Sequence, residues 1–152
     1  MLLAAACTSG GNNTVTDTAC SAQLKWNGGN SGSALMNPGM DCIACHQKEG
    51  PKFAIAGTVF AKFSETDLCQ GKSGIVVEIT DATGVVVKAT TNAAGNFSID
   101  SKSIALTMPY TAKVTYGGKE RNMNSQQTIG ACNSCHTAAG TSGAPGRIII
   151  PE

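Results

Sequence analysis

The sequence predicts a mostly β fold, a single antiparallel β-sandwich, and three observations lead to this expectation. Between residues 53 and 123, short runs rich in Val, Ile and Thr are separated by Gly, Asn and Asp. In one run Ile75, Val77 and Ile79 alternate with positions that include Glu78, so one strand face is buried and the other is partly exposed. No long window shows a 3.6-residue apolar period, which confines helix to short turns.

Each strand of the sandwich is bounded by turn residues. The expected strands are residues 53–60, 75–80, 85–91, 96–99, 110–116 and 119–123. The segments Asp81-Ala-Thr-Gly84 and Tyr116-Gly-Gly118 provide glycines where tight hairpins need positive φ. We therefore expect neighbouring strands to pair as antiparallel hairpins.

The beginning of the sequence predicts a signal remnant and a tether. Apolar and small residues lead to Cys7, which is typical of a cysteine that receives a lipid, although Leu3 lies four positions before it instead of three. Polar, Gly-rich residues follow. We expect residues 1–19 to be signal remnant and flexible tether, and residues 20–152 to form one domain. The alternative for Cys7 is a free thiol at a frayed end.

The sequence contains the C-x-x-C-H pattern twice, as Cys42-Ile-Ala-Cys45-His46 and Cys132-Asn-Ser-Cys135-His136. Two thiols three residues apart can each add to one vinyl group of a haem, and the adjacent imidazole is then held over the iron. The sequence therefore predicts two covalently attached c-type haems. We expect haem-binding segments with short helical turns at residues 36–50 and 124–150, on either side of a sandwich at residues 53–123.

Two other uses of paired cysteines fit the sequence less well. A structural zinc site with four thiolate ligands leaves the histidine after each motif unexplained. A thioredoxin-like dithiol lies at a strand-to-helix turn of a βαβ unit, which the pattern of expected strands does not contain. The haem interpretation uses all six motif residues.

The sixth iron ligands must come from outside the motifs. The chain has two histidines in total, so methionine is the expected sixth ligand unless another chain donates a histidine. Met123 lies in a polar stretch and is one candidate, and Met36 and Met40, around a turn before the first motif, are the others. Met108 continues an alternating apolar series, which predicts packing in the sandwich.

Cys20 and Cys69 remain after the motifs and Cys7 are assigned. Because c-type haem is attached in an oxidising compartment, we expect these two cysteines to form a disulfide.

With a formal net charge of +1 the chain has no basic surface for nucleic acid.

Two resemblances follow from these residues. Ala56-Gly-Thr-Val59, residues 74–81, residues 91–97 and Pro109-Tyr110 resemble the carboxypeptidase regulatory-like, prealbumin-type β-sandwich, which is an accessory scaffold in that family. The two motifs, one on each side of the sandwich, resemble small dihaem cytochrome c lipoproteins of envelope-respiring bacteria. This resemblance implies electron transfer in the periplasm, at the outer membrane or at the cell surface.

The expected function is an electron carrier, with redox proteins or extracellular acceptors as partners and self-association as a further option. One alternative is a haem-based sensor or binding module with one open coordination site. Another is a dihaem peroxidase-like enzyme, which would have to recruit Glu49, Glu65 or Arg121 as its distal group.

Overall fold

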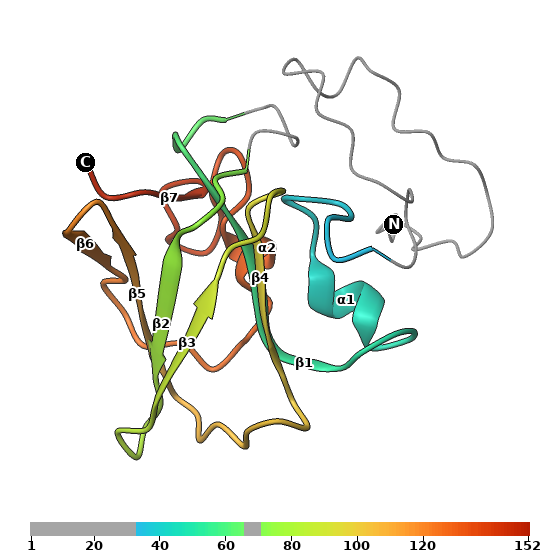
Figure 1. Cartoon of the computed structure of the whole chain (residues 1–152). Helices are drawn as coiled ribbons and strands as arrows, with labels where there is room; N and C mark the ends of the chain where they lie inside the picture. The colour runs from blue at the N-terminus through green and yellow to red at the C-terminus, as the bar shows by residue number, and fades with distance from the viewer. Residues whose placement is uncertain (1–32, 66–70) are drawn as a thin grey trace.

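The computed structural model describes residues 33–65 and 71–152, and this part of the chain is mostly β (Figure 1). Its elements in chain order are α1 (Cys42–His46), β1 (Phe53–Phe60), β2 (Val76–Thr80), β3 (Val86–Thr90), β4 (Asn96–Asp100), β5 (Thr111–Tyr116), β6 (Lys119–Asn122), α2 (Cys132–Cys135) and β7 (Ile148–Ile149). All six predicted strands are confirmed, with ends shifted by no more than one residue. The two helices of the described residues lie in the two C-x-x-C-H motifs, as expected.

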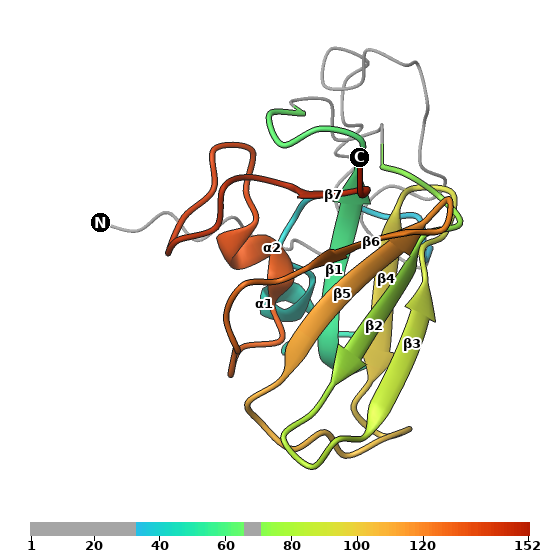
Figure 2. The same cartoon turned by 90° about the vertical axis from the view of Figure 1, so that its left-hand side faces the viewer.

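The strands form two sheets that pack on each other as a β-sandwich (Figure 2). One sheet has the order β4-β1-β7 and the other β3-β2-β5-β6. The pairs are antiparallel except that β7 runs parallel to β1. The predicted sandwich is thus confirmed, and β7 is an addition that the alternation pattern did not indicate.

The core lies between the two sheets. Ile75, Val77 and Ile79 are all buried, which confirms the predicted alternation. The first sheet contributes buried residues such as Ile55 and Phe97. Burial of these side chains is the main stabilising contribution to the sandwich.

The β2–β3 and β5–β6 hairpins close with the predicted turns. Gly84 has φ 85° and its N–H donates to the Asp81 carbonyl at 3.0 Å. Gly117 and Gly118 have φ 59° and 77°, the values of a hairpin turn that L side chains rarely adopt. The β2–β3 turn sets the register in which Val77 faces Ala89 and Ile79 faces Val87, and the β5–β6 turn sets the one in which Val114 faces Arg121.

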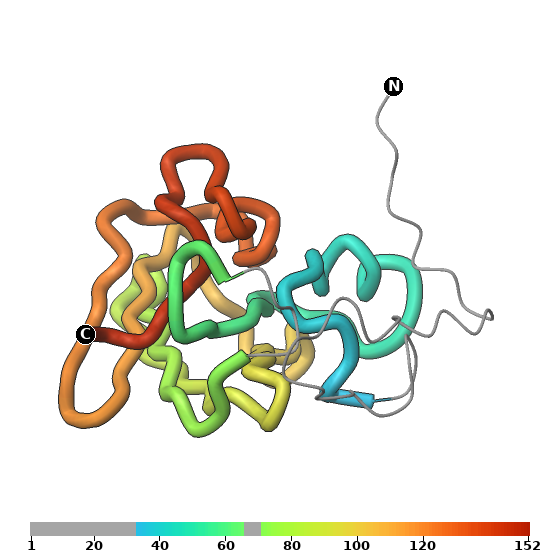
Figure 3. The backbone as a smooth tube through the Cα atoms, turned by 90° about the horizontal axis from the view of Figure 1, so that it is seen from above, coloured from blue at the N-terminus to red at the C-terminus, as the bar shows by residue number. Residues whose placement is uncertain are grey.

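Strand β1 is buried from Ile55 to Phe60, which means that both of its faces and edges are covered. One edge pairs with β4, and the other meets residues 130–131 and then β7. Both short helices also contact β1 (Figures 1 and 2). From above, the two motif segments form neighbouring lobes beside the sandwich (Figure 3).

Candidate functional site

The first motif begins and ends with side-chain hydrogen bonds. The Asp41 carboxylate accepts a bond from Ala44 N at 3.0 Å, which caps the start of α1. Lys52 Nζ donates to the carbonyls of His46 and Gln47 at 2.8 and 2.7 Å and so places a cation at the helix end. A five-residue helix is too short to be stable alone. These bonds therefore help to keep the two cysteines of the motif one turn apart.

The second motif is attached to the edge of β1 that lies opposite β4. Ala56 N donates to the Gly130 carbonyl at 3.0 Å, and Ala56 pairs with Ala131 as a parallel bridge. A Cβ at Gly130 would lie 1.8 Å from the Ala54 carbonyl oxygen, so this close approach requires glycine. Helix α2 starts two residues later and is thereby fixed against the sandwich.

Asn133, between the two cysteines of the second motif, completes the same edge of β1. Its side-chain carbonyl accepts from Thr58 N at 3.1 Å, in the place where a strand carbonyl would lie. Its amide group donates to Thr58 Oγ1 at 3.1 Å and to the Met40 carbonyl at 2.8 Å. Asn133 is buried, and it thus connects β1, the second motif and the residue that precedes Asp41.

The turn at residues 36–40 is held by the same network. The Thr58 hydroxyl accepts from Gly39 N and donates to Asn96 Oδ1, both at 2.8 Å. Asn96 Nδ2 donates to the Met36 carbonyl at 2.8 Å, and Arg147 donates to the Gly39 carbonyl at 3.4 Å. The turn before the first motif is therefore bound to β1, to β4 and to the segment after the second motif.

The two histidines differ in their surroundings. His136 Nδ1 lies 2.9 Å from the Gly146 carbonyl. Because a carbonyl oxygen only accepts, the proton lies on Nδ1 and the Nε2 lone pair is free to bind a metal. His46 Nδ1 is buried without a hydrogen-bond partner, its ring is 4.6 Å from that of Phe53, and Gly50 leaves room for it.

Three motif thiols are free and two of them are poor nucleophiles. Burial raises the pKa of Cys42 to about 11 and that of Cys132 to about 12. Reactive dithiols have lowered pKa values, so these environments do not favour a thioredoxin-like function. Among residues 33–65 and 71–152 there is also no group of three or more His, Cys, Asp or Glu that could hold a metal ion directly. Neither alternative use of the cysteines gains support.

The donors present fit c-type haem, with one difference at Cys45. Cys42, Cys132 and Cys135 are free, and His136 has the Nδ1 hydrogen bond typical of a metal-binding imidazole. Cys45 is disulfide-bonded in the structure. Because a thioether needs a reduced sulfur, haem attachment at Cys45 requires that this disulfide is absent when the haem is added.

The four methionines of the described residues fall into two groups. Met108 and Met123 pack against the hydrophobic core, and Met123 N donates to the Ala112 carbonyl at 2.8 Å. For Met108 this agrees with the prediction, whereas the polar sequence neighbours of Met123 predict a side chain without apolar surroundings, and this prediction is wrong. Met36 and Met40 lie at the ends of the turn at residues 36–40, and Met40 is 40% exposed. Met40 is thus a candidate ligand beside both motifs.

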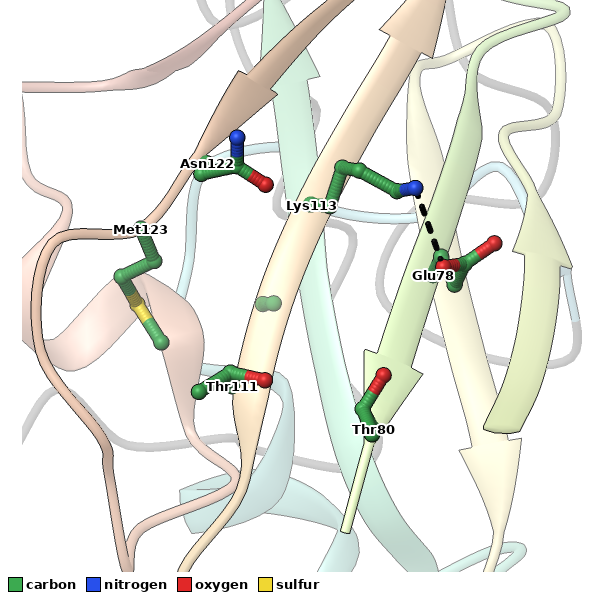
Figure 4. Close-up of a pocket in the computed structure, with 7 residues that line it drawn as sticks. Glu78, Thr80, Thr111, Lys113, Asn122 and Met123 are labelled. Carbon is green, nitrogen blue, oxygen red and sulfur yellow. Dashed lines mark ion pairs between the residues drawn. The ribbon is translucent and has the colours of Figure 1, made fainter. Parts of the chain in front are cut away.

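A shallow hollow on the outer face of the four-stranded sheet is polar (Figure 4). It has a volume of about 300 Å³, and the ion pair between Glu78 and Lys113 (3.2 Å) lies in it. Met123 is at its edge, on the loop that follows β6. Its small volume and charged lining do not suit a haem.

Several predicted features are not tested by these residues. Cys7, Cys20 and Cys69 lie outside the described residues, so the lipid and the Cys20–Cys69 disulfide stay predictions. No helix within the described ranges is long and apolar enough to cross a membrane. No protein-family model and no curated protein matches the sequence.

Sequence reasoning missed Asn133, Thr58, Asn96 and Arg147, which hold the two motifs together. Asn133 lies 75 and 93 residues from its partners Thr58 and Met40. No local pattern indicates contacts over such separations. The one available signal was the presence of a small amide between the two cysteines of a motif, which by itself is also compatible with a surface position.

Proposed function

We propose that this chain is a dihaem c-type cytochrome that carries electrons in the bacterial envelope or at the outer cell surface. The observation that supports this most directly is the hydrogen bond between Asn133 and the Met40 carbonyl, which places the two C-x-x-C-H motifs side by side. An electron carrier with two haems needs them close together. Motifs far apart on the sandwich would have argued against it.

The residues of the two motifs have separate roles in this proposal. Cys42, Cys45, Cys132 and Cys135 form the thioethers, and His46 and His136 are the proximal ligands. The Gly146 carbonyl orients the His136 ring. When bound, each haem supplies an iron that accepts and releases one electron.

The sixth ligands are proposed to come from the turn at residues 36–40. Met108 and Met123 pack against the core, whereas Met36 and Met40 are not part of that packing and Met40 is 40% exposed. Met123 remains the third candidate, because it is only partly buried. Methionine ligation would raise both reduction potentials relative to histidine.

Location and partners follow from the same chemistry. Covalent haem attachment and the predicted Cys20–Cys69 disulfide both indicate an oxidising compartment, either the periplasm or the cell surface. Lipid attachment at Cys7 would anchor the protein to the outer membrane. Redox proteins or extracellular electron acceptors are the proposed partners, and self-association into a haem chain is compatible with the small net charge.

Haem counting in matched variants tests the proposal. The full chain is produced in an exporting host with c-type haem maturation, and the haem content is measured by pyridine haemochrome and intact mass. We expect two haems in the wild type, one in the Cys42→Ser/Cys45→Ser variant and one in the Cys132→Ser/Cys135→Ser variant. A wild type without covalent haem, or with a single haem, contradicts the proposal.

A second candidate function is a haem-based sensor with one open iron. The packing of Met108 and Met123 against the core favours it, because two adjacent methionines must otherwise serve two irons. Carbon monoxide binding to the reduced protein separates the two functions. Absence of binding supports the electron carrier, and one bound carbon monoxide per chain supports the sensor.

A further inference from the structure

We infer that Asn133 is a positioning residue that holds the two haem motifs in one fixed relative placement, and that it thereby sets the rate of electron exchange between the two haems. This inference rests on the proposed function. With both haems bound, an exchange would move one electron from the ferrous iron at one motif to the ferric iron at the other, with no bond made or broken.

The side chain of Asn133 is almost fully used in this contact. It is 4% exposed, its one acceptor oxygen is bound to Thr58 N, and its amide group donates to Thr58 Oγ1 and the Met40 carbonyl. A buried amide with all partners present occupies a single orientation. Asn133 therefore acts as a rigid spacer between the motifs.

The neighbouring Ser134 gives the contrast that shows what is specific to Asn133. Ser134 is the other residue between Cys132 and Cys135, but it is exposed and its hydroxyl donates to the Ala131 carbonyl within its own turn. Among the described residues, its hydroxyl otherwise lies 3.8 Å from Cys135 Sγ of the same motif and makes no hydrogen bond to the first motif or to the turn before it. Of the two residues between the cysteines, Ser134 thus bonds within its own motif, whereas Asn133 bonds to the residues before the first motif.

The connection ends next to the first pair of cysteines. The Met40 carbonyl, which accepts from Asn133 Nδ2 at 2.8 Å, also lies 3.5 Å from Cys42 Sγ. The path from one motif to the other is thus covalent except for one hydrogen bond. Movement of the second motif relative to Met40 would change the separation of the two haems, on which electron exchange depends strongly.

The surrounding network makes it possible to separate this role from general stabilisation. Asn96 holds the same turn from the side of β4, through bonds to the carbonyls of Met36 and Ala34 at 2.8 and 3.3 Å. It does not contact the second motif directly. Asn96→Ala removes these bonds and the acceptor of the Thr58 hydroxyl, and we expect it to leave the direct bond between Asn133 and the Met40 carbonyl in place.

The experiment compares Asn133→Ala and Asn133→Asp with Ser134→Ala and Asn96→Ala in the full-length holoprotein. Asn133→Asp keeps an oxygen for Thr58 N and loses both amide donors. The haem count is determined first, and exchange is then followed after photoreduction of one haem in the oxidised protein. The electron paramagnetic resonance spectrum reports the magnetic interaction of the two irons.

We expect both Asn133 variants to carry two haems, to lose part of the magnetic interaction and to exchange electrons about tenfold more slowly, because small misplacements are costly. The exchange rate of Ser134→Ala should match that of the wild type, and the rate of Asn96→Ala should be close to it.

Unchanged exchange in the Asn133 variants would overturn the inference, as would equal slowing in Asn96→Ala. If both Asn133 variants lose a haem that Asn96→Ala keeps, Asn133 is needed for haem attachment and not for the exchange rate, which also overturns the inference. A wild type without two haems would instead refute the proposed function.

Discussion

Single residues with little or no side chain allow the second motif to lie directly against β1. Gly130 accepts a hydrogen bond from Ala56 N, and a Cβ at Gly57 would lie 2.8 Å from Cys132 Cβ. The motif residues that do carry polar side chains, Asn133 and His136, are fixed by hydrogen bonds to other segments. His46 lacks such a bond at Nδ1, so the two proposed iron sites differ at their proximal ligands.

Replacing Gly130 with alanine should destabilise the attachment of the second motif. The new Cβ would lie 1.8 Å from the Ala54 carbonyl oxygen, so backbone must move. We expect a loss of about 3 kcal/mol in the free energy of unfolding, measured by urea denaturation of the holoprotein. Gly143→Ala is the control, because nothing lies within 4 Å and only its φ of 87° is strained, which costs about 1 kcal/mol. Equal losses in the two variants would show that residue 130 is not tightly packed.

At the scale of elements, local chemistry predicts the strands and hairpins well but not the contacts between distant segments. The alternation of Ile75, Val77 and Ile79 and the glycines at the turns determine β2 and its hairpin locally. Strand β7 has two residues, and its partner β1 is far away in sequence, so no periodicity reveals it. For the site, the motif spacing predicts the six proposed haem residues, whereas the proposed role of Asn133 depends on tertiary contacts.

The β2–β3 hairpin is expected to weaken in acid through one carboxylate. Hydrogen bonds from Thr107 N, the Thr83 hydroxyl and the backbone N–H groups of Val85 and Thr83 lower the pKa of Asp81 to about 2. In the unfolded chain the pKa of Asp is about 3.9. The ionised carboxylate therefore stabilises the fold fully above about pH 4, and this contribution is lost as the pH falls through the folded value.

The isosteric variant Asp81→Asn tests this pH dependence. It should be less stable than the wild type at pH 7, because an amide nitrogen replaces one acceptor oxygen. Between about pH 4 and pH 2 the difference should shrink, since the wild type alone loses the ionised group. Urea unfolding at a series of pH values measures both. Parallel curves for the two proteins across this range would contradict the assignment.

On the scale of the whole molecule, the sandwich serves to bring together two segments from opposite ends of the domain. Residues 36–50 precede β1 and residues 124–147 follow β6, yet both are bound to β1. Arg147 adds a further connection, since its guanidinium lies 4.8 Å from the Phe60 ring and donates to the Gly39 carbonyl. The proposed cofactors would thus share one support and move as a unit.

Haem attachment should also change the charge of the molecule. The polypeptide has a formal net charge of +1 and an isoelectric point of about 7.6. In the ferrous state the porphyrin balances the iron, and each haem adds about two ionised propionates, so the holoprotein should carry about −3. Isoelectric focusing under reducing conditions should place the wild type well below pH 7, with each double Cys→Ser variant between the wild type and the form that lacks all four motif cysteines. Equal isoelectric points for these forms would show that the propionates are neutralised by proton binding or that haem is absent, and the haem count distinguishes the two.

A net charge this small also predicts that the rate of reaction with a basic redox partner falls only weakly as ionic strength rises.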